Sequence, residues 1–438
     1  MLRQRGRASK ACLRQVAIGF THMPLMSMDE IRRVVIVGAG QAGGETAQRL
    51  RQGGFSGEIT LIGEEQLAPY QRPPLSKQYL SGEYGVERLL LRPAELYAQE
   101  HIALLTGKRA VWIDRANKRV RLEGGRELPY EALVLATGAR PRKLALAGAD
   151  LQGVHLLRTA ADVDAIRAEF KPGAKLVVVG AGYIGLEVAA VARKLGLDVC
   201  VIESAARPLA RVTSPEVSGF FLDEHTRQGV RFMLGGQPAL IRGGERVRGV
   251  ALADGAEAAA DLVIAGIGVM PETALARQCG LSVDDGIVTD DLCHTEDPAI
   301  FAIGDCARRP MAHYDQRLQR LESVHNAVEG AKLVAAAILG QAPPVRETPW
   351  FWSDQYDLKL QIAGLFQGYD AMALRGSMSD RAFAAFYYKA GRLIAVDAVN
   401  RPGEYLGAKM LIQQGRSIAP EVLSDISRPM KELVAAAG

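Results

Sequence analysis

The chain has 438 residues, of which 48% are hydrophobic and 23% charged, and its formal net charge is +4. This length predicts two or three domains, and no apolar run reaches the roughly 18 residues that a membrane span requires. Residues 1–27 carry five basic side chains and no acidic one, so the remainder has a net charge of −1. That balance argues against a nucleic acid as partner.

The basic segment 1–27 has no clear helix or strand pattern. Three interpretations compete: an arginine-rich targeting peptide, a disordered basic arm, and a start placed upstream of the true one. Met26 and Met28 stand directly before the first predicted strand, which favours the last interpretation. The apolar stretch 16–20 is too short for the core of a secretory signal.

The first predicted unit is a strand, a helix and a strand across residues 32–63. Its first strand is followed by Gly38, Gly40 and Gly43, which match G-x-G-x-x-G. Glu64 closes the second strand and is the preferred ribose-binding acid, with the neighbouring Glu65 as the other candidate. The glycines permit a tight turn, a close approach to a pyrophosphate and close packing of the helix. Phosphates are favoured at the helix N-terminus, and the acid accepts hydrogen bonds from ribose.

A loop follows at residues 68–77, and a buried strand at 132–135 runs into the small-residue turn Ala136-Thr137-Gly138. Such a turn brings the backbone close to a flavin or to the crossing between two domains.

A second fingerprint repeats the whole pattern. A β-branched run is followed by Gly180, Gly182 and Gly185, then by a helix, and Glu203 ends the next strand. Two complete fingerprints predict two dinucleotides in one chain. A bound flavin and a nicotinamide form the favoured pair, so the sequence predicts an electron-transfer enzyme that handles hydride. Residues 262–268 are expected to form the closing strand of this unit.

The chain is then expected to return to the first unit, with a strand at 300–303 followed by Gly304 and Asp305. From Trp350 onward, the pattern alternates at 358–362 and 382–388, and helices are expected near 406–413 and 429–437. We therefore expect an α/β protein with two Rossmann-like dinucleotide-binding domains and a C-terminal α+β domain. The expected bounds are 28–141 with 270–347, then 142–269, and finally 348–438.

The five cysteines have no C-x-x-C spacing, and no Cys/His group has the spacing of a metal site, so we expect no metal. A cytoplasmic location fits this pattern. Disulfide reductases of this architecture carry a cysteine pair, which in one type follows the first acid. Here that region reads Pro73-Pro74-Leu75-Ser76-Lys77, so electrons are expected to leave the flavin by a route without thiols.

Several segments together resemble a known family. They are V-G-A-G-Q-A-G from Val37, R-P-P-L-S-K from Arg72, A-T-G-A-R-P from Ala136, G-A-G-Y-I-G-L-E from Gly180, A-I-G-D-C from Ala302 and W-F-W-S-D-Q from Trp350. The chain from residue 28 onward is similar to the FAD-dependent NADH:ferredoxin reductases of bacterial monooxygenase and dioxygenase systems, the family of putidaredoxin reductase and the biphenyl dioxygenase reductase. The resemblance implies non-covalent FAD, a central NADH domain and a C-terminal interface domain.

For FAD, the resemblance implies that the first fingerprint holds the pyrophosphate and that Arg72 and Lys77 lie near the flavin. Lys77 is expected to pair with Glu187 and to stabilise negative charge on the reduced ring. Trp352, Ser353, Asp354 and Gln355 are expected to approach the ring. The full set of expected FAD-binding residues is Gly38, Gly40, Gly43, Glu64, Arg72, Lys77, Thr137, Gly138, Asp305 and Trp352, and the expected catalytic pair is Lys77 and Glu187.

For NADH, the carboxylate of Glu203 is expected to accept the ribose hydroxyls and to repel the extra phosphate of NADPH. Arg207 and Arg211 lie nearby in sequence and could instead bind the extra phosphate of NADPH, so this alternative stays open. Tyr183 either shields the flavin or packs in the core. The full set of expected NADH-binding residues is Gly180, Gly182, Tyr183, Gly185, Glu187, Glu203 and Arg211.

The expected activity is hydride transfer from NADH to FAD, followed by delivery of single electrons to a [2Fe–2S] ferredoxin. That ferredoxin would supply a haem monooxygenase or a ring-hydroxylating dioxygenase. A rubredoxin reductase, or a redox-signalling protein like apoptosis-inducing factor, is the alternative. An acidic ferredoxin calls for a basic docking patch, for which the candidates are Arg308, Arg309, Arg317 and Arg320. His325 and Asn326 match another segment of the family, and two interpretations are open for them: a structural or helix-capping role, or a role in catalysis.

Overall fold

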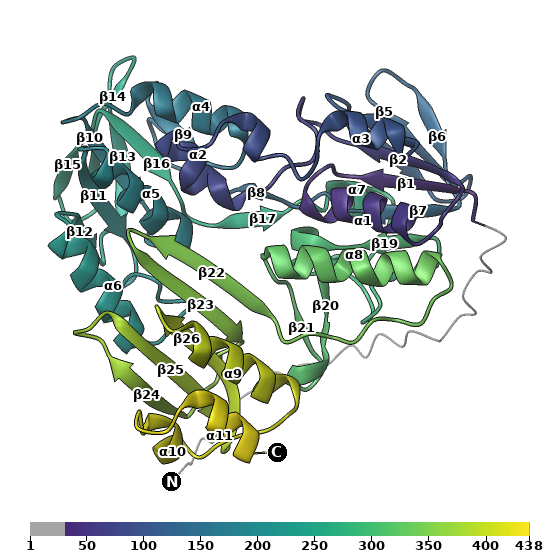
Figure 1. Cartoon of the computed structure of the whole chain (residues 1–438). Coiled ribbons are helices and arrows are strands. Elements are labelled where there is room, and N and C mark those ends of the chain that lie inside the picture. The colour runs from purple at the N-terminus through teal and green to yellow at the C-terminus, as the bar shows by residue number, and fades with distance from the viewer. Residues whose placement is uncertain (1–30, 438) are drawn as a thin grey trace, which may run out of the picture.

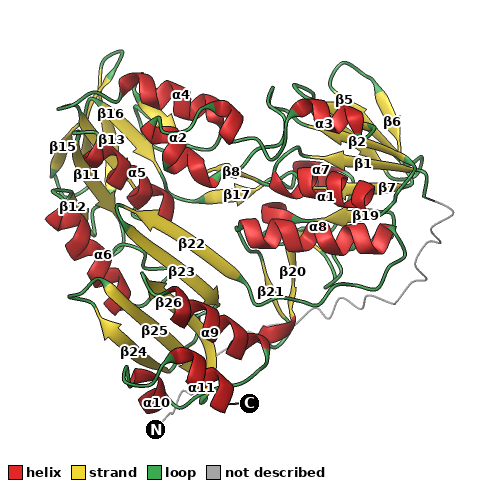
Figure 2. Ribbon diagram, in the orientation of Figure 1, coloured by secondary structure: helices red, strands yellow, loops and turns green. Residues whose placement is uncertain are grey.

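The computed structural model describes residues 31–437, apart from the side chain of His313. The interpretations of segment 1–27, and of Met26 and Met28 as starts, lie outside these residues. The chain forms three units, one around each of three five-stranded sheets (Figures 1 and 2).

The first unit is built on a parallel sheet with the strand order β19-β7-β1-β2-β3. Its strands are β1 (Arg33–Val37), β2 (Glu58–Ile62), β3 (Ile102–Leu105), β7 (Ala132–Leu135) and β19 (Ile300–Ala302). β7 and the central part of β1 are buried on both faces, as expected of apolar strands in a covered parallel sheet. Helices α1 (Gln41–Gln52) and α8 (Val324–Ile338) lie side by side on one face (Figure 1).

Smaller elements complete this unit. An antiparallel layer has the order β4-β5-β6, and a second small sheet has the order β18-β20-β21. Their bounds, with those of the nearby helices, are β4 (Ala110–Asp114), β5 (Arg119–Leu122), β6 (Glu127–Pro129), β18 (Ile287–Val288), β20 (Ala307–Met311), β21 (Arg317–Gln319), α3 (Ala94–Gln99), α7 (Ala274–Gln278), η4 (Gly304–Cys306) and η5 (Ala312–Tyr314).

The second unit repeats the arrangement with the parallel order β12-β11-β10-β16-β9. A three-stranded antiparallel sheet, β13-β14-β15, adjoins it. The elements are β9 (Val154–Leu156), α4 (Ala160–Glu169), β10 (Lys175–Val179), α5 (Tyr183–Lys194), β11 (Asp198–Glu203), α6 (Pro215–Arg227), β12 (Arg231–Leu234), β13 (Pro238–Gly243), β14 (Val247–Leu252), β15 (Glu257–Ala259) and β16 (Leu262–Ala265).

Two connections join the first and second units. The antiparallel ribbon of β8 (Ala139–Pro141) and β17 (Val269–Pro271) carries the chain across and back, and it spans the gap between the two sheets in Figure 1. The loop after β2 forms η2 (Pro73–Ser76), α2 (Gln78–Ser81) and η3 (Val86–Arg88), and it packs against α4 and α5 of the second unit. This loop therefore belongs to the first unit in sequence and reaches the second in space.

The third unit is an antiparallel sheet with the order β22-β23-β26-β25-β24, flanked by α9, α10 and α11. The bounds are β22 (Trp350–Gln355), β23 (Leu358–Gly364), β24 (Ala371–Ser377), β25 (Ala382–Lys389), β26 (Arg392–Val399), α9 (Pro402–Gln413), α10 (Pro420–Ser424) and α11 (Met430–Ala436). Strand β22 lies against α5 of the second unit, and one continuous apolar core extends from Tyr79 through Leu186 to Phe383. The third unit is thereby packed onto the fingerprint helix of the second.

The expected fold class is confirmed: two parallel α/β units and a C-terminal α+β unit. Two element boundaries differ from prediction by three residues or more. The closing strand β16 ends at Ala265 rather than residue 268, because Gly266 and Gly268 begin the turn toward β17. Helix α9 begins at Pro402, four residues before the expected start, since proline is well suited to a first helical turn. Among residues 31–437, no helix is long and apolar enough to cross a membrane.

Candidate active site

A cavity of about 710 Å³ opens at the carboxyl edge of the first sheet. Gly38, at the turn out of β1, has φ +113°, and a Cβ there would lie 2.1 Å from the carbonyl oxygen of Ala136, so only glycine fits. A Cβ on Gly40 would meet nothing within 4 Å, which leaves space for a ligand against the backbone. Helix α1 starts at this point without a side-chain cap, so its first N–H groups face the cavity side.

The third glycine of the first fingerprint has a packing role. A Cβ on Gly43 would lie 1.9 Å from the carbonyl oxygen of Gly38, so glycine is required for α1 to approach the turn. Gly43 does not line the cavity, whereas Gly38 and Gly40 do.

The two candidate acids after β2 have different surroundings. The Glu65 carboxylate accepts hydrogen bonds from the Tyr70 hydroxyl and, at 2.6 Å, from Nη2 of Arg72. Glu64 keeps 73% of its side chain exposed, and its nearest charged partner is Arg109 Nε at 3.8 Å. Both acids line the cavity. The Glu64 carboxylate is therefore the one left open to accept new hydrogen bonds.

Polar groups from three segments converge on the same cavity. Arg72 donates from Nη1 to the carbonyl of Arg158 at 2.6 Å, and Arg158 pairs with Asp305 at 3.2 Å. Thr137 Oγ1 donates to the carbonyl of Glu272 at 2.5 Å. Burial and the neighbouring Arg72 lower the pKa of Arg158. The cavity thus places two guanidinium groups and helix α1 where a dinucleotide would bring its negative charge.

In the loop that follows Arg72, Lys77 forms a buried ion pair with Glu187 of α5. Lys77 Nζ lies 2.6 Å from Oε2 of Glu187, and the two residues are 9% and 3% exposed. Ser76 Oγ also donates to Oε2, and Ser353 Oγ donates to Oε1 at 2.6 Å. Both carboxylate oxygens of the buried Glu187 therefore have hydrogen-bond partners, one of which is the Lys77 cation. The contact expected between Lys77 and Glu187 is present.

The second fingerprint has the same geometry as the first. Gly180 has φ +105°, and a Cβ there would lie 2.5 Å from the carbonyl oxygen of Gly266. A Cβ on Gly182 would meet nothing within 4 Å, and one on Gly185 would lie 2.1 Å from the carbonyl oxygen of Gly180. Glu203 Oε2 accepts from the amide of Ala181 at 2.7 Å, so the acid lies directly at the turn. These residues fit a second dinucleotide.

The two arginines after β11 have different surroundings. Arg207 donates to the backbone carbonyls of Ala210, Thr213 and Ser214, at 3.1, 3.0 and 3.3 Å respectively. Its guanidinium therefore holds the loop together. Arg211 is exposed, and its Nη2 lies 3.7 Å from the position that a Cβ on Gly268 would take. Of the two, Arg211 is the side chain that remains available to a bound nucleotide.

Aromatic side chains of the third unit approach the fingerprint helix of the second. Tyr183, the first residue of α5, stacks on Phe351 of β22 with ring centroids 4.9 Å apart. Trp352 packs beside Trp350 at 5.6 Å. Trp352 and Lys77 do not line the 710 Å³ cavity, whereas the other expected FAD residues do, apart from Gly43. Tyr183 therefore belongs to the interface of the second and third units, whereas Trp352 packs on its neighbours in β22.

The arginines considered as a docking patch do not form one. Arg309 is buried and paired with Glu329, and Arg308 pairs with Asp284. Arg320 has a side chain that is 10% exposed and pairs with Asp285 and Glu322. Of the four, only Arg317 is exposed. The expectation of a basic patch here is wrong, because acidic side chains pair with three of the four arginines.

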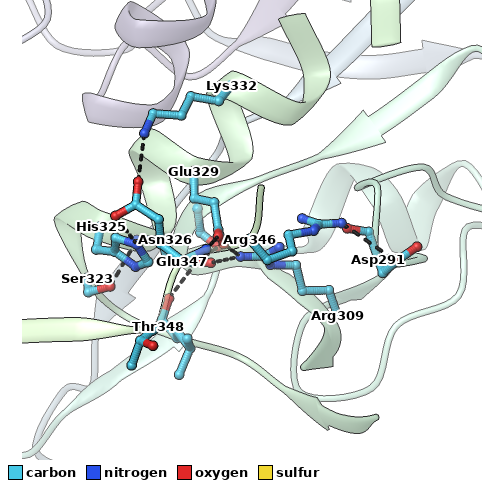
Figure 3. A network of polar contacts seen from close by, with 12 residues as sticks. Asp291, Arg309, Ser323, His325, Asn326, Glu329, Lys332, Arg346, Glu347 and Thr348 are labelled. Atoms are coloured by element: carbon cyan, nitrogen blue, oxygen red, sulfur yellow. Dashed lines mark hydrogen bonds and ion pairs between the residues drawn. The ribbon is translucent and has the colours of Figure 1, made fainter. Parts of the chain in front are cut away.

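His325 and Asn326 belong to a structural network around the start of α8 (Figure 3). The side-chain Nδ2 of Asn326 donates to the carbonyls of Gly304 and Leu321 at 3.2 and 2.8 Å. The backbone N–H of Asn326 donates to Ser323 Oγ, which caps the helix. His325 is buried, packs on Trp350 at 5.5 Å and lies 3.9 Å from Glu347. This network links α8 to the segment that enters β22, which supports the structural interpretation.

Some site residues had no signal in the sequence. Arg158 precedes the capping residue of α4 and has no motif around it, so only the packing of α4 against the η2 loop brings it to the cavity. The contribution of Ser76 to Glu187 was missed in the same way. Glu272 lines the cavity because the β8/β17 ribbon places it opposite Thr137.

Comparison with known proteins gives consistent matches over nearly the whole chain. Residues 32–331 match the family described as pyridine nucleotide-disulphide oxidoreductase, and residues 350–434 match one described as reductase C-terminal. Putidaredoxin reductase of Pseudomonas putida is 44% identical over 410 residues, with 92% of this chain and 97% of that protein covered. Rubredoxin-NAD(+) reductase of Pseudomonas putida is 40% identical over 370 residues, covering 84% and 96%.

A solved structure matches equally well. The covalent complex of putidaredoxin reductase with putidaredoxin contains a chain that superposes with a TM-score of 0.90 at 44% identity. The match covers 93% of this chain and 99% of that one.

Proposed function

The chain belongs to the pyridine nucleotide-disulphide oxidoreductase family, among its ferredoxin reductases, and we propose that it oxidises NADH and reduces a [2Fe–2S] ferredoxin. The observation that carries this function is the presence of two dinucleotide fingerprints in one chain, together with a buried ion pair, Lys77 with Glu187, that joins the loop of the first unit to the fingerprint helix of the second. Bound FAD supplies the chemistry: it accepts a hydride and gives up electrons singly. The side chains supply binding, orientation and charge.

The first unit, residues 28–141 with 270–347, binds FAD. Gly38, Gly40 and the N-terminus of α1 hold the pyrophosphate, and Glu64 accepts hydrogen bonds from the adenosine ribose. Arg72 and Asp305 complete the polar wall of the cavity, with Thr137 and Gly138 as the backbone wall. The open space before Gly40 and the cavity of 710 Å³ support this assignment.

The second unit, residues 142–269, binds NADH, and Glu203 selects it over NADPH. The carboxylate lies at the fingerprint turn and repels a further phosphate on the ribose. Arg207 is fully used by its own loop, which removes one of the two cations that could have bound that phosphate. Arg211 stays exposed near Gly268 and binds the pyrophosphate or stacks on adenine.

Lys77 is the catalytic cation and Glu187 its partner. A fixed positive charge beside the flavin stabilises the negative charge that the ring gains on reduction, and it requires no reorganisation when the hydride arrives. Burial of the pair strengthens this interaction because little water screens it. Tyr183 covers the fingerprint turn on the side of the third unit.

The third unit, residues 348–438, forms the interface toward the electron acceptor, with Trp352 near the flavin. The ferredoxin in turn supplies a haem monooxygenase or a ring-hydroxylating dioxygenase. We place the protein in the cytoplasm; the four cysteines of the described chain are free thiols, which a reducing compartment maintains.

The test is an acceptor assay with the purified yellow protein. NADH-driven reduction of a [2Fe–2S] ferredoxin is measured beside reduction of a rubredoxin, with NADPH in parallel for each. The proposal predicts faster reduction of ferredoxin and a preference for NADH. Faster reduction of rubredoxin would instead assign the chain to the activity of its 40% identical relative. Flavin that NADH reduces without passing electrons to either carrier would favour a signalling role.

A further inference from the structure

A series of buried hydrogen bonds leads away from the catalytic ion pair into the interface of the second and third units. Ser353 Oγ lies 2.6 Å from Glu187 Oε1, and Gln355 Nε2 lies 3.1 Å from Ser353 Oγ. His225 Nε2 lies 2.8 Å from Gln355 Oε1, and the Tyr356 hydroxyl lies 3.1 Å from His225 Nδ1. Glu187, Ser353, Gln355 and His225 are at most 3% exposed.

The chemistry at one end fixes the direction of every bond in the series. A carboxylate only accepts, so the single hydroxyl proton of Ser353 must point at Glu187. Ser353 Oγ must then accept from the amide nitrogen of Gln355, which turns the amide oxygen toward His225. His225 must therefore donate from Nε2, and in a neutral ring Nδ1 then has no proton and accepts from Tyr356.

Two further observations agree with this direction. Burial lowers the pKa of His225 to about 4, so the ring is neutral and its Nδ1 can accept a hydrogen bond. Tyr356 has φ +57° in the turn between β22 and β23, an unusual conformation for a large side chain. Strain of this kind persists where surrounding contacts fix it, and here the hydroxyl contact to His225 is one of them.

We propose that Gln355 and His225 are positioning residues for Glu187: a directed series of hydrogen bonds through Ser353 holds the Glu187 carboxylate against Lys77. The series crosses from α6 to β22 to α5, so it ties the geometry of the ion pair to the docking of the third unit on the second. This inference rests on the proposed function, because it takes the Lys77–Glu187 pair as the catalytic pair.

The decisive variant is Gln355→Leu, which fills similar space and can neither donate to Ser353 nor accept from His225. The rate constant of flavin reduction at saturating NADH and the Kd of NADH are measured by anaerobic stopped flow, in the native and the Glu187→Gln backgrounds. We expect a loss of about fivefold in the rate constant in the native background, an unchanged Kd, and a loss under about twofold in the Glu187→Gln background.

Tyr387→Phe is the matched control. It also removes a buried hydroxyl from the interface of the second and third units, where Tyr387 donates to Asp397 and lies 3.4 Å from Thr213 Oγ1; within residues 31–437 this hydroxyl has no hydrogen bond to a member of the series. We expect its rate constant to stay near the native one. Ser353→Ala, which deletes one oxygen atom, guards against misfolding of Gln355→Leu and should slow reduction to a similar extent. Equal losses from Gln355→Leu in both backgrounds, or no loss, would overturn the proposal.

A second measurement needs no turnover. Nitrogen-15 NMR of histidine-labelled holoenzyme reports which ring nitrogen of His225 is protonated, with His225→Gln used to assign the signal. The proposal requires a single neutral form protonated on Nε2, and a shift of that signal in Glu187→Gln. A proton on Nδ1, or a signal unchanged in Glu187→Gln, would contradict it. This result stands even if the native protein fails to reduce a ferredoxin, so the two failures are distinguishable.

Discussion

At the scale of single residues, the structure concentrates unscreened charge at the Lys77–Glu187 pair. A buried ion pair is stable only where its remaining hydrogen-bonding capacity is used, and removal of one partner leaves an uncompensated charge. Here Ser76 and Ser353 donate to the same carboxylate that Lys77 contacts at 2.6 Å. The two members of the pair therefore depend on each other for stability.

Lys77→Met should slow flavin reduction by NADH by roughly 10²-fold, the size of effect seen when one preorganised charge donor is removed from an active site. It should also lower the free energy of unfolding by about 3 kcal/mol, because Glu187 is left buried and unpaired. Anaerobic stopped flow and urea unfolding measure the two effects. Lys77→Met combined with Glu187→Gln should recover stability but not the rate. A double variant as unstable as the single one would count against the pairing argument.

Glu203→Gln should weaken the discrimination against NADPH. Removal of the negative charge is expected to raise the ratio of kcat/KM for NADPH to that for NADH by about tenfold, equivalent to about 1.4 kcal/mol. Glu64→Gln, at the corresponding position of the first fingerprint, is the control and should leave that ratio unchanged. If Glu203→Gln leaves the ratio at its native value, Glu203 does not select the nucleotide.

Asp397 gives a prediction for pH dependence. It is buried between Thr213 of the second unit and Tyr387 of the third, both of which donate to it. Burial raises its pKa from 3.8 to about 6. Between these values the folded protein holds a proton that the unfolded chain has lost, so the contribution of Asp397 to stability falls as the pH rises from about 4 to about 6. The full loss is about 3 kcal/mol.

Asp397→Asn removes this titration. The difference in free energy of unfolding between variant and native protein should therefore move in favour of the variant from pH 4 to pH 7, by up to about 3 kcal/mol. Tyr387→Phe should steepen the native trend, since it deletes a hydrogen bond that favours the ionised form. Urea unfolding at closely spaced pH values measures both. A difference that does not vary with pH would refute the assignment.

Residue roles were predictable where a motif fixes the backbone, and much less so elsewhere. The glycines of both fingerprints have the conformations and close approaches that their spacing predicts. The prediction of an arginine docking patch was wrong because the pairing of Arg309 with Glu329, or of Arg308 with Asp284, depends on tertiary packing. The preference for Glu64 over Glu65 remains a prediction, now supported by the engagement of Glu65 with Arg72.

At the scale of elements, each dinucleotide unit contains a glycine turn that permits a helix to start close to the end of a strand. Helices α1 and α5 both begin directly after a glycine that has no side-chain cap. The free N–H groups and the dipole at such a helix start favour negative charge, as a dinucleotide pyrophosphate carries. Strand and helix identities followed from hydrophobic periodicity, whereas ends such as those of β16 and α9 depended on local turns that periodicity does not describe.

Matched valine substitutions distinguish the ligand-binding roles of the first and second units. Gly43→Val should abolish FAD binding, because its Cβ would lie 1.9 Å from the carbonyl oxygen of Gly38. Gly185→Val should leave the protein yellow but raise the Kd of NADH at least about tenfold, since the equivalent clash is with Gly180 in the second unit. Absorbance of the purified protein and NADH titration measure these effects. Loss of flavin from Gly185→Val would show that the units do not act separately.

At the scale of the whole molecule, the Lys77–Glu187 pair and its hydrogen-bond partner Ser353 are brought together from three units. Lys77 comes from the first unit, Glu187 from the second and Ser353 from the third, and they are more than a hundred residues apart in sequence. No periodicity or local motif encodes such a meeting. The resemblance to a family suggested the contact between Lys77 and Glu187, but the extension through Gln355 to His225 became visible only in the folded arrangement.

The most direct test of the account is the stoichiometry of electron delivery under anaerobic conditions. Catalytic amounts of the native holoenzyme are mixed with oxidised [2Fe–2S] ferredoxin and limiting NADH, and the ferredoxin spectrum is followed to completion. The account predicts that each NADH reduces two ferredoxin molecules, because one hydride is delivered as two single electrons. NADH consumption that leaves the ferredoxin oxidised would contradict the central claim.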